Sequence, residues 1–194
     1  MKKGQFIVIE GIEGAGKTSA IKRAIEISNK NWIYSSGFPI NSSWDRFVHS
    51  HPNSILYYLY FAMKSIKIKS HLSNGNIVIQ DKYVQSVDSF LPDCRQLINR
   101  IARAFFSHFF VKPTLYIHFD VLTEKSIRRI GSKRGKEHKD YYRFLIEHPE
   151  FIESRRREYK RIYKKLKCPK VKIDTTNISI EKSTKIILEE IAKC

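Results

Sequence analysis

Short apolar runs alternate with longer stretches of helical periodicity along the chain. The runs are rich in β-branched and aromatic residues, and they cover residues 6–10, 32–35, 77–80, 114–119 and 171–173. Runs of this kind, each bounded by polar residues or glycine and separated by helices, indicate strands of a parallel sheet covered on both faces. The pattern therefore predicts a three-layer α/β fold.

Helical periodicity fills most of the intervals between these runs. The predicted helices cover residues 19–27, 54–72, 96–110, 152–166 and 180–191. About residues 130–142 the chain is instead polar, basic and glycine-containing, without apolar periodicity, which predicts a mobile loop. No internal repeat or low-complexity linker interrupts the pattern, so we expect residues 1–194 to form a single domain.

The interval between the first strand and the first helix carries the most specific signal in the chain. Its residues fit the pattern G-x-x-x-x-G-K-[ST] as Gly11, Ile12, Glu13, Gly14, Ala15, Gly16, Lys17 and Thr18. Strand, glycine loop and helix together predict a loop whose backbone N–H groups bind phosphates. Lys17 can reach the β- and γ-phosphates, and Thr18 can offer its hydroxyl to Mg²⁺. The alternative is a glycine turn that only links strand to helix.

Polar residues also end three of the other predicted strands, as Asp81, Asp120 and Asp174. In parallel α/β sheets ligands bind outside the carboxyl ends of the strands. We therefore expect the site at the edge of the sheet that carries these carboxylates and the glycine loop.

Composition limits the class of protein. The chain has 194 residues, 42% of them hydrophobic, which is enough for a buried core. No apolar stretch approaches the roughly 18 residues that a membrane span needs. The three cysteines, Cys94, Cys168 and Cys194, are far apart and odd in number. They favour a protein of the reducing cytoplasm.

The charge is strongly positive, with 36 Lys and Arg against 19 Asp and Glu, giving a net charge of +17. The excess peaks over residues 155–165. A nucleic-acid partner is one interpretation. We favour a solvated basic surface together with a site for small polyanions, because a nucleotide site already accounts for part of the charge.

The opening segment, residues 6–18, resembles that of the thymidylate kinases in their bacterial form. This resemblance implies the five-stranded parallel sheet of the P-loop nucleoside monophosphate kinases. It implies ATP-dependent phosphorylation of dTMP to dTDP with ATP and Mg²⁺, and a homodimer. In that family the acidic residue of the loop, here Glu13, lies near the 3′-hydroxyl of the deoxyribose. The alternative for Glu13 is a side chain that only caps the turn.

A second segment, residues 81–86, resembles the family motif D-R-Y/H-x-x-S. The resemblance gives Asp81 a place in the Mg²⁺ shell and in catalysis, and it gives Lys82 the grip on the acceptor monophosphate. Lysine keeps the charge of the family arginine but loses its bidentate fork. Ser86 matches the family serine, and Phe90 stands where the family has a tyrosine.

Two further segments resemble the substrate pocket. Tyr60 and Lys64 match an aromatic residue that stacks on thymine and a base-contacting arginine one helical turn later. Phe38 and Pro39 match the proline turn that lines the pocket, although the family arginine beside that proline has no counterpart here.

The resemblance also extends to the donor side. Arg129 aligns with an ATP-contacting arginine and Arg134 with an arginine of the mobile lid, and both would stabilise the transferring phosphoryl group. Some family members carry the catalytic cation inside the loop, where this chain has Gly14. Asp174 matches the loop that borders the adenine.

Two alternatives remain open. The lysine replacements and the missing arginine also suit a kinase that acts on another nucleotide or a nucleoside. From a different class, the basic surface suits a catalytically weak P-loop protein that binds nucleic acid.

Overall fold

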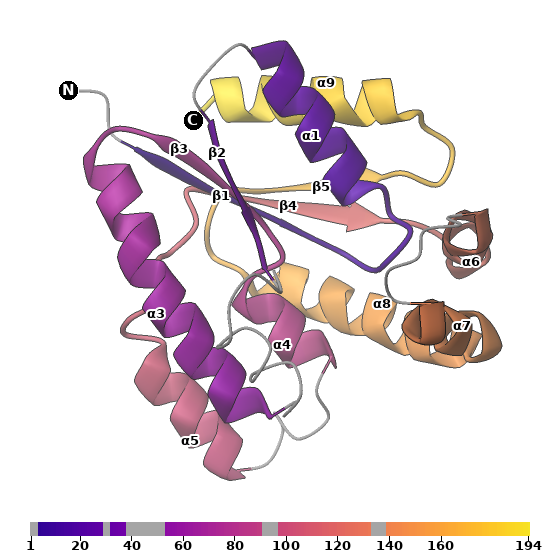
Figure 1. The fold of residues 1–194 in the computed structure, drawn as a ribbon, viewed down its shortest axis with the longest axis horizontal. Helices are drawn as coiled ribbons and strands as arrows, with labels where there is room; N and C mark the ends of the chain where they lie inside the picture. The colour runs from indigo at the N-terminus through magenta and orange to yellow at the C-terminus, as the bar shows by residue number, and fades with distance from the viewer. Residues whose placement is uncertain (1–3, 29–31, 38–52, 91–96, 133–138) are drawn as a thin grey trace.

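A computed structural model describes residues 4–28, 32–37, 53–90, 97–132 and 139–194. Five parallel strands form one sheet in the order β2-β3-β1-β4-β5, with helices on both faces (Figure 1). The strands are β1 (Gln5–Glu10), β2 (Trp32–Ser36), β3 (Ile77–Asp81), β4 (Leu115–Asp120) and β5 (Lys170–Asp174). The predicted α/β class and five-stranded parallel sheet are confirmed.

The helices form the two outer layers. They are α1 (Lys17–Ser28), α3 (Ser54–Ser73), α4 (Val84–Phe90), α5 (Leu97–Phe106), α6 (Thr123–Ser132), α7 (Lys139–Glu147), α8 (Pro149–Lys165) and α9 (Ile180–Ala192). In Figure 1, α1 and α9 lie above the sheet, α3, α4, α5 and α8 lie below it, and α6 and α7 lie at one end.

The alternation of side chains along the central strand β1 builds both halves of the core. Ile7 and Ile9 pack in the cluster that includes α1 and α9, whereas Phe6 and Val8 pack in the cluster that includes α3 and α4. All four side chains are buried. A strand that is buried on both faces has a continuous apolar sequence, which is why β1 could be predicted from the sequence.

The structure adds α4 and α6 to the predicted helices, and it differs from the prediction in where three helices begin or end. The predicted helix over 96–110 ends at Phe106, and single turns follow it, as in the 2.9 Å bond from the Phe109 amide to the Phe106 carbonyl. Helix α8 begins at Pro149, before the predicted residue 152, because proline is favoured in the first helical turn. Helix α7 begins inside the predicted loop and continues beyond it, where Leu145 is buried; residues 133–138 lie outside the described part.

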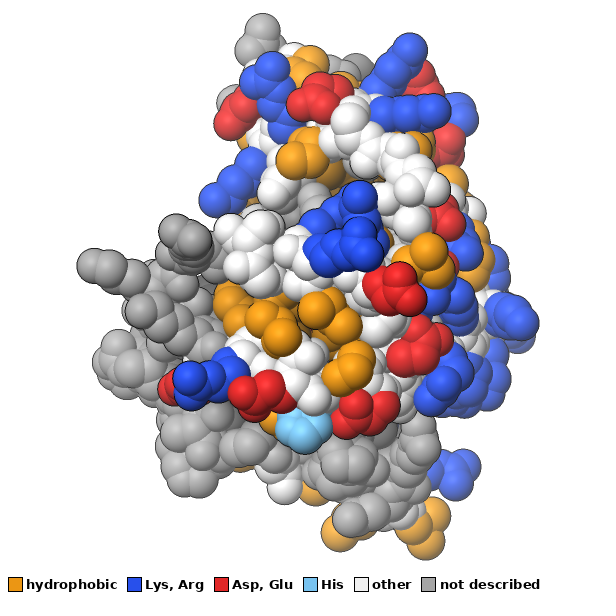
Figure 2. All heavy atoms as spheres, turned by 90° about the vertical axis from the view of Figure 1, so that its right-hand side faces the viewer, with side chains coloured by type: hydrophobic (Ala, Val, Ile, Leu, Met, Phe, Trp, Pro, Cys, Tyr) orange, Lys and Arg blue, Asp and Glu red, His pale blue; other side chains and the backbone are white. Residues whose placement is uncertain are grey.

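The basic segment over 155–165 does not present all of its cations to solvent. Arg155 is buried, and Arg156 donates a 2.6 Å bond to the buried Asp120. On the end of the molecule that carries α6 and α7, basic, acidic and hydrophobic side chains are interspersed (Figure 2). Among the described residues, no helix is both long and apolar enough to cross a membrane, and Cys168 and Cys194 are free thiols.

Candidate active site

A glycine loop joins β1 to α1 at the carboxyl end of the central strand. Gly11 has φ +145°, and a Cβ added there would lie 2.1 Å from the Phe119 carbonyl oxygen of β4. Gly14 has φ +71°, and a Cβ there would lie 2.7 Å from the Ser126 carbonyl oxygen of α6. Both positions combine a backbone conformation that favours glycine with a close backbone neighbour. Glycine therefore lets the loop pack directly against β4 and α6.

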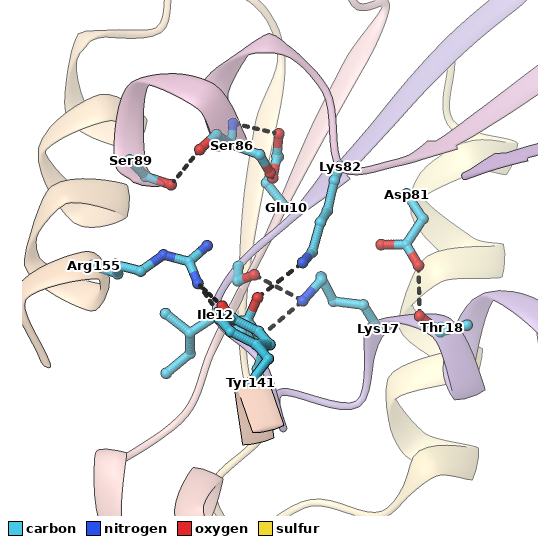
Figure 3. Close-up of polar contacts among 12 residues, drawn as sticks. Glu10, Ile12, Lys17, Thr18, Asp81, Lys82, Ser86, Ser89, Tyr141 and Arg155 are labelled. Carbon is cyan, nitrogen blue, oxygen red and sulfur yellow. Dashed lines mark hydrogen bonds and ion pairs between the residues drawn. The ribbon is translucent and has the colours of Figure 1, made fainter. Parts of the chain in front are cut away.

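Lys17, the first residue of α1, lies across this loop. Its Nζ donates hydrogen bonds to the carbonyl oxygens of Gly11 (2.7 Å) and Ile12 (2.8 Å), as Figure 3 shows. Burial, reinforced by repulsion from Lys82, lowers the pKa of Lys17 to about 8. The N–H groups at the start of α1 lie at the same place, and a helix N-terminus favours anions. The arrangement is suited to binding phosphate oxygens.

Thr18 and Asp81 place two hard oxygen ligands beside the loop. The Thr18 hydroxyl donates a 2.6 Å bond to Asp81 Oδ2, and the Tyr34 hydroxyl lies 3.3 Å from the same oxygen. Asp81 Oδ1 is buried and has no hydrogen-bond partner in the described part of the chain. A buried carboxylate oxygen without a donor, next to a hydroxyl, suits a divalent cation such as Mg²⁺.

The second acidic group of the site is Glu13, which lies in a cluster with Lys82, Arg155 and Tyr141; we call these four residues the Glu13 cluster. Lys82 Nζ lies 2.9 Å from Glu13 Oε1, and Arg155 Nη1 lies 2.5 Å from Glu13 Oε2 (Figure 3). Burial alone would raise the pKa of Glu13, but Arg155, Lys82 and Lys17 hold it well below its usual range. Glu13 is therefore ionised, with a cation on each carboxylate oxygen.

Aromatic rings enclose the guanidinium of the Glu13 cluster. The Arg155 guanidinium carbon lies 5.0 Å from the centroid of the Phe90 ring, a cation–π distance. Phe90 in turn contacts Tyr141 and Phe151 edge to face, with centroids 6.2 and 6.1 Å apart. Helices α4, α7 and α8 thus meet around one buried cation.

Lys82 has an unusual backbone as well as a paired side chain. Its φ is +67°, in the left-handed region that residues other than glycine rarely adopt. The Lys82 amide donates to the Ile9 carbonyl (3.0 Å), and the Lys82 carbonyl accepts from Gln80 Nε2 (2.7 Å). These bonds hold the strained residue in place, and such strain clusters at functional sites.

Below the loop, Glu10 anchors the segment after β3. Its carboxylate accepts the amides of Tyr83 (2.7 Å) and Ser86 (3.1 Å), together with the hydroxyls of Ser86 (2.6 Å) and Tyr159 (3.2 Å). Burial raises the pKa of Glu10 to about 7, although these hydrogen bonds and nearby lysines oppose the rise. Glu10 thereby fixes β1, α4 and α8 relative to one another.

On the other side of the loop, α6 and the segment after β5 contact it directly. Arg129 donates to the carbonyl oxygens of Gly14 (3.2 Å) and Thr175 (2.6 Å). The Ser126 hydroxyl donates to the Glu13 carbonyl at 2.7 Å. Asp174 Oδ1 accepts the Thr176 amide at 2.9 Å. The arginine therefore joins three elements around the glycine loop.

Helix α3 contributes an aromatic residue and a cation to the same side of the sheet as α4. Tyr60 is buried edge to face against Phe61, with centroids 5.3 Å apart. Lys64 Nζ lies 5.7 Å from the Tyr60 ring centroid and donates to the Ser36 carbonyl at the end of β2. The two side chains share one face of α3, as their spacing predicted.

Comparison with known proteins decides the family. The family model of the thymidylate kinases matches residues 9–187, which is nearly the whole chain. The chain belongs to the thymidylate kinase family.

Two relatives align with this chain over nearly its whole length. The thymidylate kinase of Buchnera aphidicola subsp. Schizaphis graminum is 30% identical and covers 100% of this chain and 97% of the relative. The probable thymidylate kinase of Methanococcus aeolicus is 27% identical to this chain, and the alignment covers 96% of this chain and 95% of the relative. Among solved structures, thymidylate kinase from Candida albicans matches with a TM-score of 0.77 at 17% identity, covering 98% of this chain and 92% of that one. This last likeness supports the fold.

The structure brings together most of the predicted residues of this thymidylate kinase family member. The glycine loop with Glu13 and Lys17 lies within hydrogen-bond distance of residues that end or follow β3. The Ser86 hydroxyl binds Glu10, so its contact with substrate stays a prediction. Phe38, Pro39 and Arg134 lie outside the described residues.

Among the site residues that sequence reasoning missed, Glu10 and Arg155 carry ionisable groups at the centre of the site. Glu10 carries a signal in hindsight, because it is an acidic residue that ends an otherwise apolar strand. Arg155 carries a weaker one, because it shares a helix face with Ile152 and Tyr159 at i, i+3 and i+7, and both neighbours are buried. A charge on the buried face of a helix needs a partner, and here the partner is Glu13.

Proposed function

We propose that this protein transfers the γ-phosphoryl group of ATP to dTMP, giving dTDP and ADP. One observation carries the proposal: the phosphate-binding loop and the acceptor-side cation Lys82 meet at one carboxylate, because Lys82 binds Glu13 of the loop at 2.9 Å. A donor-phosphate cradle and an acceptor grip side by side fit phosphoryl transfer, which depends on positioning and charge neutralisation. Family membership supplies the acceptor, dTMP.

On the donor side, the loop amides and Lys17 hold the ATP phosphates in this proposal. Arg129, which donates hydrogen bonds to the carbonyls of Gly14 and Thr175, contacts ATP in this proposal. Asp174 ends β5 on the same side and borders the adenine. Arg134 supplies a further cation to the transferring group from the lid.

Thr18 and Asp81 would hold Mg²⁺, since the unpaired buried Oδ1 of Asp81 and the adjacent hydroxyl fit a hard cation. When bound, the ion supplies charge neutralisation at the β- and γ-phosphates. The described residues contain no group of three metal-binding His, Cys, Asp or Glu side chains. The remaining ligands in this proposal are phosphate and water oxygens.

On the acceptor side, we assign Lys82 to the dTMP phosphate and Glu13 to the deoxyribose. Tyr60 stacks on the base and Lys64 contacts it, while Phe38, Pro39, Ser86 and Phe90 line the pocket. A dTMP phosphate oxygen attacks the γ-phosphorus, and the bond from that phosphorus to the β–γ bridging oxygen breaks. No general base is needed, because a phosphate monoester with a second pKa near 6 is ionised at neutral pH.

We also propose a homodimer that uses the outer face of α5. Ile98, Ile101 and Phe105 are largely exposed on this helix, and α3, which contacts α5, also exposes Met63 and Ile66. Exposed apolar groups of this kind mark interaction surfaces. The four phenylalanines at and after the end of α5 divide between two environments: Phe106 and Phe110 pack against the core, whereas Phe105 and Phe109 are exposed.

A substrate panel tests the proposed reaction. The purified protein is given ATP and Mg²⁺ with dTMP, dUMP, dAMP, dGMP, dCMP, thymidine or deoxyadenosine, and ADP release is measured. We expect the highest kcat/KM with dTMP. Higher kcat/KM with a nucleoside, or with another monophosphate, would instead support a kinase of different specificity.

A further inference from the structure

The charge balance of the Glu13 cluster depends on Arg155. Lys82 is the cation assigned to the acceptor phosphate, but it is paired with Glu13 at 2.9 Å. These two residues alone have no net charge, and a neutral pair attracts a phosphate weakly. Arg155 adds one positive charge on the opposite oxygen of the same carboxylate, 2.5 Å away. The three residues together are therefore cationic.

We propose that Arg155 is a positioning residue of the acceptor site, which holds and neutralises Glu13 so that Lys82 remains an effective cation for the acceptor phosphate. The inference rests on the proposed function and extends it to a residue of the basic helix α8. Arg155 acts through Glu13, not by touching the reacting atoms.

The geometry of Arg155 supports a fixed orientation. Its side chain is only 4% exposed, and Nη1 donates both to Glu13 and to the Tyr141 hydroxyl, 3.1 Å away. The ring of Phe90 covers the guanidinium at 5.0 Å. Because a separate cation binds each oxygen of Glu13, the orientation of the carboxylate is held from both sides.

The burial of Arg155 argues against a purely structural role, because removing a charge from water is costly. A buried ion pair loses much of its Coulomb energy to desolvation, and well-packed apolar residues often serve stability equally well. Arg155 also has a buried Nε without a hydrogen-bond partner among the described residues. A residue kept only for packing would gain nothing from this unsatisfied donor. The charge itself is what the site uses.

Calorimetric titration with dTMP and with thymidine separates the phosphate from the rest of the ligand. The proteins are the wild type, Arg155→Met, Arg155→Lys, Glu13→Gln, the double variant Arg155→Met with Glu13→Gln, and Arg157→Met as control. Arg157 is an exposed arginine of the same helix. Circular dichroism and melting temperature establish that each variant is folded.

We expect Arg155→Met to weaken dTMP binding about tenfold or more while thymidine binding changes less than about twofold. Once Glu13→Gln has removed the carboxylate, adding Arg155→Met should change dTMP affinity by less than about threefold relative to Glu13→Gln alone. Arg155→Lys should lie between, because it keeps the charge and loses the fork. Arg157→Met should match the wild type.

Each other outcome has a definite meaning. Equal losses for dTMP and thymidine, unchanged dTMP affinity in Arg155→Met, or an undiminished effect of Arg155→Met in the Glu13→Gln background would overturn the inference and leave the proposed function standing. If Arg155→Met does not fold, Arg155→Lys decides in its place, and a loss that is not specific to dTMP overturns the inference. A wild type that binds no dTMP would overturn the proposed function and this inference with it.

Discussion

Thr18, at the start of α1, donates a 2.6 Å hydrogen bond to Asp81, at the end of β3. The two residues are 63 positions apart in the chain. They meet because β1 and β3 are paired in parallel, with Ile9 opposite Asp81. Sheet register thus brings the loop hydroxyl to the carboxylate that we assign to the cation.

Replacing Asp81 by asparagine exchanges one carboxylate oxygen for an amide nitrogen and keeps the shape of the side chain. We expect kcat to fall about 100-fold or more, equivalent to about 2.7 kcal/mol of transition-state stabilisation. Tyr34→Phe is the matched control, because it removes only the longer 3.3 Å contact to the same oxygen. Steady-state kinetics at saturating Mg²⁺ measure both, and an Asp81→Asn enzyme within about threefold of wild type contradicts the assignment.

The buried carboxylate of Glu10 predicts a dependence of stability on pH. Its pKa is raised from 4.5 to about 7, so between these values the folded protein binds more protons than the unfolded chain. The raised pKa therefore adds to the free energy of unfolding. This stabilisation is fully present below pH 4.5 and is lost as the pH rises through 7. From pH 5 to 7.5 the free energy of unfolding should fall by about 1–3 kcal/mol relative to Glu10→Gln. Urea unfolding of the wild type and of Glu10→Gln at both pH values tests this. The same change in the free energy of unfolding with pH in both proteins would refute it.

Two glycines of the loop should differ in their tolerance of a methyl group. Gly16 has φ +86° but no atom within 4 Å of an added Cβ, so Gly16→Ala should cost about 1–2 kcal/mol through backbone strain alone. Gly14→Ala adds a collision 2.7 Å from the Ser126 backbone and should cost about 2–4 kcal/mol. Urea denaturation of both variants compares them. An equal or reversed order would show that α6 does not pack on the loop as described.

The exposed face of α5 predicts a dimer. Light scattering after gel filtration should give twice the 22.9 kDa mass of the chain. Ile101 is 61% exposed on this face. Ile101→Asp should give the mass of the monomer, because an unpaired charge in an apolar interface is costly. Ile27→Asp is the control, since Ile27 is also half-exposed but lies on α1. A wild type of single mass at micromolar concentration would exclude this dimer.

The strands and the glycine loop were predictable because their signals are local. Each strand is a short apolar run with a polar end, and the loop is a contiguous motif. Helix α4 spans seven residues, and α7 begins with the polar pair Lys139 and Asp140, so neither shows a clear apolar period at its start. Their position depends on packing with distant segments.

The candidate site was predictable where the chain supplies both partners near strand ends, as with Thr18 and Asp81. Arg155 could not be assigned in the same way, because its partner Glu13 lies 142 positions earlier. Composition placed it within a basic surface helix. Its spacing from Ile152 and Tyr159 is a weak signal, and the packing of α8 shows that this arginine points inward.

The most direct test of the account is transfer of label from [γ-³²P]ATP to dTMP, with the product separated by chromatography. The wild type with Mg²⁺ should form labelled dTDP, and Lys17→Met should form it at least about 100-fold more slowly, because the loop loses its phosphate cation. Absence of labelled dTDP above the Lys17→Met background would contradict the central claim that this site phosphorylates dTMP.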